Sequence, residues 1–312
     1  MPAARDVGAQ GRQELAKDSR FKTQHSALGY APELTWHTGS LLLDRPRVMG
    51  VVNVTPDSFS DGGRFFDPEA ALDEAYKQVE EGAAIVDIGG ESTRPGATDV
   101  SATEELRRVM PVMERLAGEL DTPISVDTSK PEVIREAVAA GAVMVNDVRA
   151  LQLPGALEAV EEADCALCLM HMQGSPATMQ DKPHYENVVE EVSDFLEARA
   201  DTCVDAGIPP DHIVLDPGFG FGKTRAHNLS LLRHLGDLLD LGHPVLVGLS
   251  RKSLIGALVG ADTAGRLPGS LAAATLAGWL GASIIRAHDV RATVQALAVM
   301  SAVRLEAEPD DG

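Results

Sequence analysis

Polar side chains follow eight short apolar runs of this sequence, at the point where each run ends. In chain order they are Asn53, Asp87, Asp127, Asn146, His171, Asp216, Lys252, and Arg286 with His288. One polar residue at such a position is commonly a helix cap or a turn former. Eight in succession, combining carboxylates, amides and cations, instead predict a binding or catalytic rim.

The kind of polar group changes along the chain. The middle runs end in Asp127, Asn146 and Asp216, and the last two runs end in the cations Lys252 and Arg286, with His288. A ligand that fits this arrangement donates hydrogen bonds at one end and is anionic at the other. Charge-assisted hydrogen bonds to such groups contribute roughly 1.5–3 kcal/mol each.

The apolar runs have the length and composition of buried strands. They are Val48–Asn53, Ala84–Gly89, Pro123–Asp127, Val143–Asp147, Ala166–His171, His212–Asp216, Pro244–Leu249 and Ser283–His288. The amphipathic stretches between them include Pro68–Glu81, Thr103–Leu120, Pro131–Ala140 and Asn187–Ala206. Continuous apolar runs indicate strands covered on both faces. Eight strand–helix units are the number that closes a barrel, in which all strand ends meet at one rim.

The predicted fold is therefore α/β, a single (β/α)8 TIM barrel. The alternative is an open doubly wound sheet, which usually carries a glycine-rich phosphate turn after its first strand; this sequence has none there. The same pattern predicts a largely disordered N-terminal extension over residues 1–37. The barrel is expected over residues 38–304, and an acidic tail over residues 305–312.

Composition limits the partners and the location of the protein. The formal net charge of −20 argues against nucleic acid and anionic membranes, which both require positive contact surfaces. We find neither a signal peptide nor an apolar run long enough to cross a membrane. Cys165 and Cys168 form a C-x-x-C pair, but residues three apart on a strand point to opposite faces, so we expect core cysteines. Three cysteines without a disulfide framework favour a reducing cytoplasm.

The loops after the first two runs make the sequence specific. Asn53–Gly63 and Glu91–Gly96 are rich in small residues and carry charges beside Pro and Gly, so they are either plain turns or mobile loops that close over a reaction. Together with neighbouring segments they resemble the signature segments of the bacterial dihydropteroate synthase family. The segments are Met49–Gly63, Asp87–Ala97, Ser125–Thr128, Asn146–Asp147, Leu215–Lys223 and Gly248–Lys252. The resemblance covers about residues 40–300.

The resemblance implies a cytoplasmic transferase of folate biosynthesis. Such an enzyme condenses 6-hydroxymethyl-7,8-dihydropterin pyrophosphate with p-aminobenzoate to give 7,8-dihydropteroate and pyrophosphate. Its partners are small molecules, its cofactor is Mg2+, and it is a homodimer packed through barrel helices. Because the arylamine is a neutral nucleophile, no strong base is needed, and we expect a dissociative (SN1-like) transfer in which cations stabilise the departing anion.

The resemblance also implies a role for each motif residue. The catalytic residues are Asp216, Lys252 and Arg286, and the metal ligand is Asn53. The pterin contacts are Asp127, Asn146, Met170, Asp216, Phe221 and Lys252, with core filling as the alternative for Met170. The pyrophosphate contacts are Thr93, Arg94, Arg286 and His288. The p-aminobenzoate pocket comprises Phe59, Thr93, Arg94, Pro95, Phe221 and Ser253. Phe59, Thr93, Pro95 and Ser253 match the pattern of sulfonamide-sensitive family members, which predicts sulfonamides as inhibitors.

Three other functions compete with this interpretation. A corrinoid-linked methyltransferase also uses a pterin on a barrel, but it requires a cobalamin partner and lacks a loop like Asn53–Gly63. A catalytically silent pterin-binding paralogue is expected to have lost a cation or a loop residue, whereas Thr93, Lys252 and Arg286 are all present. A purely structural protein does not explain eight polar strand ends.

Overall fold

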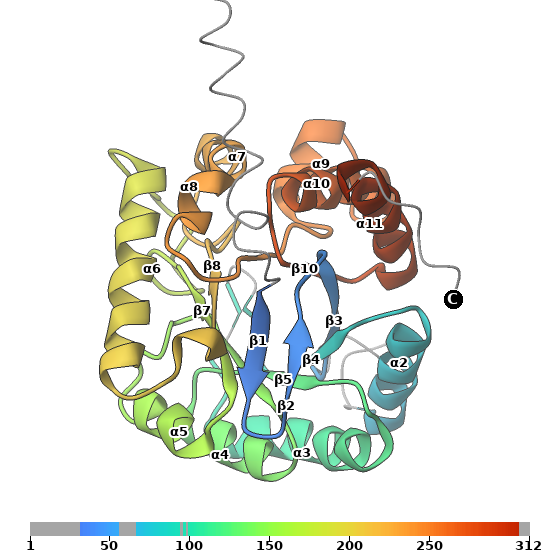
Figure 1. Cartoon of the computed structure of the whole chain (residues 1–312), viewed down its shortest axis with the longest axis vertical. Coiled ribbons are helices and arrows are strands. Elements are labelled where there is room, and N and C mark those ends of the chain that lie inside the picture. Colours follow the sequence, from blue (N-terminus) through green and yellow to red (C-terminus); the bar gives the residue numbers. More distant parts are fainter. Residues whose placement is uncertain (1–31, 56–66, 94–95, 98, 306–312) are drawn as a thin grey trace, which may run out of the picture.

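Eight parallel strands form the centre of the fold, and a layer of helices surrounds them (Figure 1). The computed structural model describes residues 32–55, 67–93, 96–97 and 99–305. The barrel strands are β3 (Arg47–Asn53), β4 (Ile85–Gly89), β5 (Ile124–Asp127), β6 (Met144–Asp147), β7 (Ala166–Met170), β8 (Ile213–Asp216), β9 (Leu246–Val247) and β10 (Ile284–Ala287). The helices are α2 (Pro68–Glu80), α3 (Ala102–Glu119), α4 (Pro131–Ala139), α5 (Ala156–Ala163), α6 (Val188–Asp205), α7 (Arg225–Arg233), α8 (Leu235–Leu239), α9 (Ser253–Val259), α10 (Leu267–Trp279) and α11 (Val290–Leu305).

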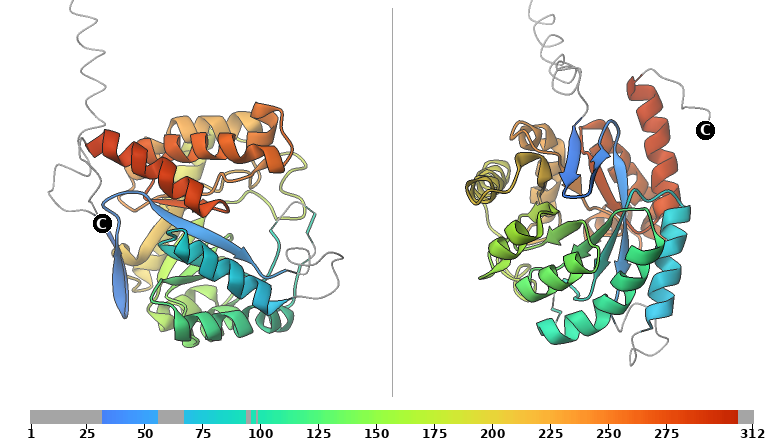
Figure 2. Two further views of the ribbon diagram at one scale, coloured as in Figure 1. Left: turned by 90° about the vertical axis from the view of Figure 1, so that its right-hand side faces the viewer. Right: turned by 60° about the horizontal axis from the view of Figure 1, so that its bottom comes forward.

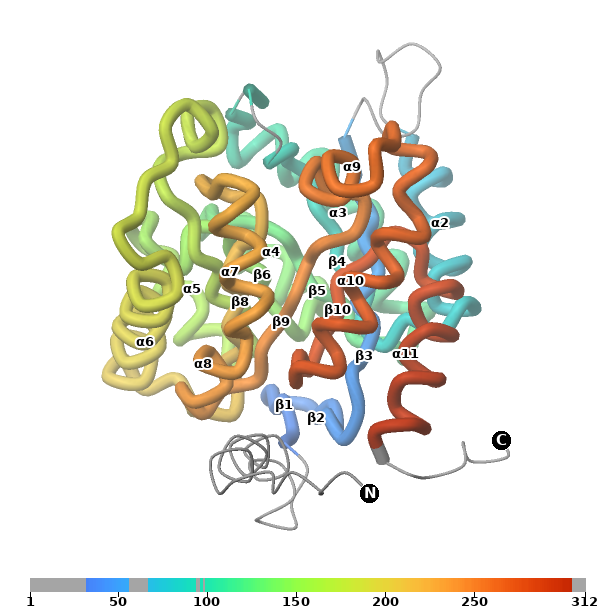
Figure 3. Tube along the Cα trace, turned by 90° about the horizontal axis from the view of Figure 1, so that it is seen from above, coloured from blue at the N-terminus to red at the C-terminus, as the bar shows by residue number. Residues whose placement is uncertain are grey.

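The strand order confirms the predicted (β/α)8 barrel. Hydrogen-bonded neighbours run β8-β7-β6-β5-β4-β3-β10-β9. The remaining seam, between β8 and β9, is joined by a parallel bridge from Leu215 to Val245 and by a hydrogen bond of 2.9 Å from the Leu215 N–H to the Pro244 carbonyl. Figure 3, turned by 90° from the view of Figure 1, shows the barrel from the side with helices flanking these strands.

Local signals account for where the elements begin and end. Asp67 and Ser101 cap α2 and α3 with their side chains. Strand boundaries agree with the prediction to within one residue, except for β9, which spans two residues where 244–249 was expected. The chain leaves the sheet early because it already turns at Leu249, whose carbonyl accepts a hydrogen bond of 3.3 Å from the Lys252 N–H.

The inward faces of the strands are divided into an apolar floor and a polar mouth. Side chains two residues apart on a strand share one face. Such pairs are Ile85 with Asp87, Met144 with Asn146, Val214 with Asp216, and Ile284 with Arg286. The apolar members belong to one buried cluster inside the barrel, and a second, larger cluster packs the outer strand faces against the helices. The floor therefore fixes the direction in which the polar members point.

The predicted end of the disordered N-terminal extension, at residue 37, was wrong. Residues Glu33–Trp36 form strand β1, which pairs antiparallel with β2 (Gly39–Leu42). Leu34 and Leu43 are buried in the same cluster as the barrel floor, so this hairpin covers the N-terminal end of the barrel. Figure 2 shows the hairpin at the end of the barrel where β3 begins. The rest of the expected extension and most of the acidic tail, residues 306–312, lie outside the described residues.

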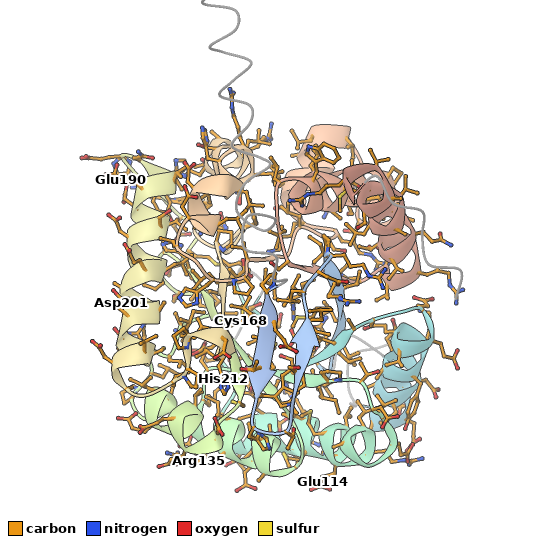
Figure 4. All side chains as sticks on the ribbon, in the orientation of Figure 1. Glu114, Arg135, Cys168, Glu190, Asp201 and His212 are labelled. Carbon is orange, nitrogen blue, oxygen red and sulfur yellow. The ribbon has the colours of Figure 1, made fainter. Side chains whose placement is uncertain are left out.

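The cysteines are buried, and charged side chains lie on the outer surface of the helices. Cys165 packs among the helices and Cys168 inside the barrel, and both are free thiols, which confirms that the pair points to opposite faces. In Figure 4 the labelled Glu114, Arg135 and Glu190 project from the outer helices into solvent. Among the described helices, none is long and apolar enough to span a membrane.

Candidate active site

Arg286 lies between two carboxylates at the mouth of the barrel. Its Nε donates to Asp87 Oδ2 at 2.6 Å, and its Nη2 donates to Asp127 Oδ2 at 2.8 Å. Asn146 Nδ2 donates to the same Asp87 oxygen at 2.9 Å. These four residues come from β10, β4, β5 and β6, and we call them the Arg286 cluster.

Burial and charge act against each other in the Arg286 cluster. Burial alone would lower the pKa of Arg286, but the charges of Asp87 and Asp127 outweigh it, so the pKa is raised and the guanidinium stays charged. Burial raises the pKa of Asp127 to about 7, although Arg286 opposes this shift. Two carboxylates share one guanidinium, so carboxylate oxygens remain to accept from a ligand that donates hydrogen bonds.

Asp216 and Lys252 form the second charged group of the mouth. Burial raises the pKa of Asp216, with Lys252 opposing the shift, and Asp216 Oδ1 accepts a hydrogen bond of 2.7 Å from the Gly218 N–H. Burial lowers the pKa of Lys252 to about 8, with Asp216 opposing. Lys252 Nζ donates to the Phe219 carbonyl and lies 4.8 Å from the centroid of the Phe221 ring. An aromatic face, a cation and a carboxylate thus meet in one place.

The loop after β8 is held by the buried ammonium of Lys223. Its Nζ lies 2.8 Å from His171 Nδ1 and donates to the carbonyls of Gly218 and Phe221, both at 3.0 Å, and of His171 at 3.3 Å. Gly218 has φ +67°, and a Cβ there would lie 1.9 Å from the His171 carbonyl oxygen, so only glycine fits. The loop that presents the Phe221 ring is therefore pre-organised.

Further predicted residues surround these two groups. Met170 is 4% exposed and lies in register with Asp216. Thr93 lines a cleft together with Asp127. Ser253 is exposed as the first residue of α9.

Asn53 and His288 are two further residues that the sequence assigns to the site. Asn53 ends β3 and is half-buried, and within the described part of the chain its side-chain amide has no hydrogen-bond partner. The His288 N–H donates to Ser250 Oγ at 3.2 Å, and its ring Nδ1 lies 3.2 Å from the same oxygen. Three predicted residues lie outside the described residues: Phe59, Arg94 and Pro95.

Comparison with known proteins matches this geometry to a family. The family model of pterin binding enzymes matches residues 49–288. The dihydropteroate synthase of Escherichia coli is 52% identical over 263 residues, which cover 84% of this chain and 93% of the relative. The chain belongs to the dihydropteroate synthase family.

Solved structures of the dihydropteroate synthase family share the barrel. The enzyme of Xanthomonas albilineans with 4-aminobenzoic acid superposes with a TM-score of 0.84 at 54% identity, covering 90% of this chain and all of that one. The enzyme of Yersinia pestis in a sulfonamide drug complex gives a TM-score of 0.84 at 50% identity, covering 88% and 99%. As a member of this family, the protein is a transferase.

Some residues of this family member received no role from the sequence. Asp87 was noted only as a strand end, yet it holds both Arg286 and Asn146. The alternation from Ile85 would have placed it inward. Lys223 and His171 form a pair that no spacing reveals, because three of the four acceptors around Lys223 are backbone carbonyls.

His171 predicts a measurable loss of stability in acid. Burial, followed by the charge of Lys223, lowers the pKa of His171 from 6.5 to about 3. The unfolded chain therefore binds a proton between pH 6.5 and 3 that the folded chain does not, so this residue lowers stability as the pH falls through that window. In urea unfolding, His171→Gln should reduce the pH slope by up to about 1.4 kcal/mol per unit. His234→Gln, at an exposed histidine, is the control, and equal slopes for all three proteins would contradict the assignment.

Proposed function

We propose that this chain condenses 6-hydroxymethyl-7,8-dihydropterin pyrophosphate with p-aminobenzoate to give 7,8-dihydropteroate and pyrophosphate in folate biosynthesis. The observation that carries the proposal is that the Arg286 cluster lies at the same barrel mouth as Asp216 and Lys252. The dihydropteroate synthase of Xanthomonas albilineans, which is 52% identical, was solved in complex with 7,8-dihydropteroate, and this supports the substrate class.

The pterin would occupy the polar mouth. Its N–H edge can donate to the carboxylates of Asp127 and Asp216, and Asn146 adds an amide. Lys252 would donate to the ring carbonyl. Charge-assisted bonds of this kind are about twice as strong as neutral ones. The apolar surfaces of Met170 and Phe221 would line the pocket around the ring.

Pyrophosphate would bind beside the pterin, at the cationic side of the mouth. The two ion pairs of Arg286 use two of its five N–H groups, so further donors remain for an anion. His288 lies two residues further along the chain, and we assign it, with Thr93 and Arg94, to the same anion. These groups would stabilise the negative charge that develops on the leaving group.

p-Aminobenzoate would bind next to the reacting methylene group of the pterin. Thr93, Phe221 and Ser253 are the described members of this pocket, and Phe59, Arg94 and Pro95 are its remaining proposed members. The structure of the Xanthomonas albilineans enzyme with 4-aminobenzoic acid supports this ligand for the family.

Asn53 fits the role of a Mg2+ ligand. Its amide supplies an oxygen, which hard cations prefer, and no described group competes for it. Among the described residues no cluster of His, Cys, Asp and Glu could hold a metal alone, so Asn53 would act together with substrate oxygens. When bound, Mg2+ supplies neutralisation of pyrophosphate charge.

The proposed mechanism is dissociative and uses Asp216, Lys252 and Arg286. The C–O bond to pyrophosphate breaks first, and the electron pair leaves with the anion, where Arg286 stabilises it. Positive charge then spreads over the pterin, where the buried Asp216 carboxylate stabilises it. The neutral arylamine attacks the cation and releases its proton afterwards, so the site requires no strong base.

A direct assay tests this function. We expect the protein to form dihydropteroate from the two substrates with Mg2+ and to lose most of that activity in excess chelator. Asp216→Asn should lower kcat by about a hundredfold or more, because the carboxylate acts only as charge develops, while circular dichroism stays unchanged. Asp211→Asn, at an exposed surface residue, is the control. An inactive wild-type protein would refute the function, and a fully active Asp216→Asn variant would refute only the assigned role.

Binding order gives a second test. We propose that pyrophosphate and pterin complete the second pocket, so sulfonamides should bind the ligand-free protein weakly. With pterin, pyrophosphate and Mg2+ present, calorimetry should show binding about tenfold tighter or more, because the first ligands populate the competent state. The sulfonamide complex of the Yersinia pestis enzyme supports this inhibitor class. Equal affinity in both titrations would exclude ordered assembly.

We further propose a homodimer formed through α10 and α11. These helices expose an apolar surface whose members are Leu276, Trp279, Val299 and Val303, between 48% and 68% exposed. Sedimentation should give twice the 33.0 kDa of one chain, and Leu276→Lys should shift the protein toward the monomer. Leu229→Lys, on α7 and 41% exposed, should leave the mass unchanged. A monomeric wild-type protein would contradict the proposal.

We also place the reaction in the cytoplasm. All three cysteines of the chain are buried free thiols, which suits a reducing compartment. Alkylation of all three thiols in denatured protein taken directly from cells would support this location, whereas a disulfide would oppose it.

A further inference from the structure

The turn after β9 contains a residue in an unusual backbone conformation. Arg251 has φ +57°, a left-handed backbone conformation that residues other than glycine rarely adopt. It directly precedes Lys252 and Ser253, which the proposed function assigns to the pterin and to p-aminobenzoate. A residue held in such a conformation requires surrounding contacts that fix it.

The backbone N–H, the carbonyl and the guanidinium of Arg251 are each held by hydrogen bonds to other residues. Its N–H donates to Ser270 Oγ at 3.0 Å, and its carbonyl accepts from Arg266 Nη1 at 2.8 Å. Its guanidinium donates two hydrogen bonds to the Asp289 carboxylate, from Nε to Oδ2 at 2.9 Å and from Nη2 to Oδ1 at 2.5 Å. Ser270 also donates to the Arg266 carbonyl at 2.9 Å, so the two backbone contacts support each other.

Asp289, the ion-pair partner of Arg251, belongs to the segment that carries Arg286 and His288. Asp289 follows His288 and lies three residues after Arg286, and its carbonyl accepts from the Thr293 N–H at 3.0 Å at the start of α11. The bidentate pair therefore ties the turn that carries Lys252 to the strand end that carries Arg286 and His288. A planar two-bond grip fixes orientation as well as distance.

We propose that Arg251 and Asp289 are positioning residues, which set the placement of Lys252 and Ser253 relative to Arg286 and His288. The inference rests on the proposed function, since it concerns the geometry of that same site. An isolated exposed ion pair would contribute little to stability, so the expected effect is on turnover more than on folding. Reacting groups misplaced by about 1 Å can cost up to a hundredfold in rate.

A double-mutant cycle tests the proposal. Arg251→Gln and Asp289→Asn should each lower kcat by about tenfold and raise the KM for p-aminobenzoate, with Tm close to that of the wild type. The double variant should be no worse than either single variant, because both remove the same contact. Arg251→Gly accepts the backbone conformation without strain but lacks the grip, so it should be impaired as well.

Arg135→Gln is the matched control. Arg135 pairs with Glu162 at 2.9 Å between α4 and α5, and its side chain is 44% exposed against 43% for Arg251. This variant should keep wild-type kcat and KM.

Each contrary outcome has a distinct meaning. If Asp289→Asn is fully active while Arg251→Gln is impaired, Arg251 acts on substrate directly and the proposal is overturned. Full activity of Arg251→Gly, independent effects that multiply in the double variant, or losses that follow Tm alone would also overturn it. A wild-type protein that makes no dihydropteroate refutes the proposed function and this inference with it, whereas active wild-type protein with unaffected variants refutes the inference alone.

Discussion

The ion pairs of Arg286 with Asp87 and Asp127 are the interaction on which the site depends. A guanidinium between Asp87 and Asp127 fixes three strand ends relative to one another, and Asn146 adds a fourth. Charges in the interior are costly unless they are paired and hydrogen-bonded, so this part of the barrel cannot relax without exposing an unpaired charge. Arg286 itself stays charged because Asp87 and Asp127 raise its pKa against the effect of burial.

The apolar half of the barrel makes this charge distribution possible. Met49, Ile85 and Met144 fill the floor, and the hairpin residue Leu34 covers it from below. Water is thereby kept from the lower barrel, and the polar side chains above can only face the mouth. On these strands the apolar residue of the floor and the polar residue of the mouth are thus two positions apart, which is one full period of the side-chain alternation.

Much of this architecture could be predicted from the sequence. Buried strands such as Ala166–Met170 are continuous apolar runs, and their polar ends identify the rim. The hairpin was missed because a four-residue strand carries little periodicity. The role of Lys223 was missed because its contacts are mostly backbone carbonyls. The left-handed conformation of Arg251 is not encoded by residue type at all; it arises from contacts with Ser270, Arg266 and Asp289.

The shortness of β9 has a mechanical consequence. On one flank it pairs with β10, whereas its described contacts toward β8 are the bridge between Leu215 and Val245 and the hydrogen bond from the Leu215 N–H to the Pro244 carbonyl. This seam runs between the strand that carries Asp216 and the turn that carries Lys252. Because one bridge joins β8 to β9 where every other neighbouring pair of barrel strands shares two or more paired residues, separating Asp216 from Lys252 along this line would break less strand pairing than a separation between any other two neighbours.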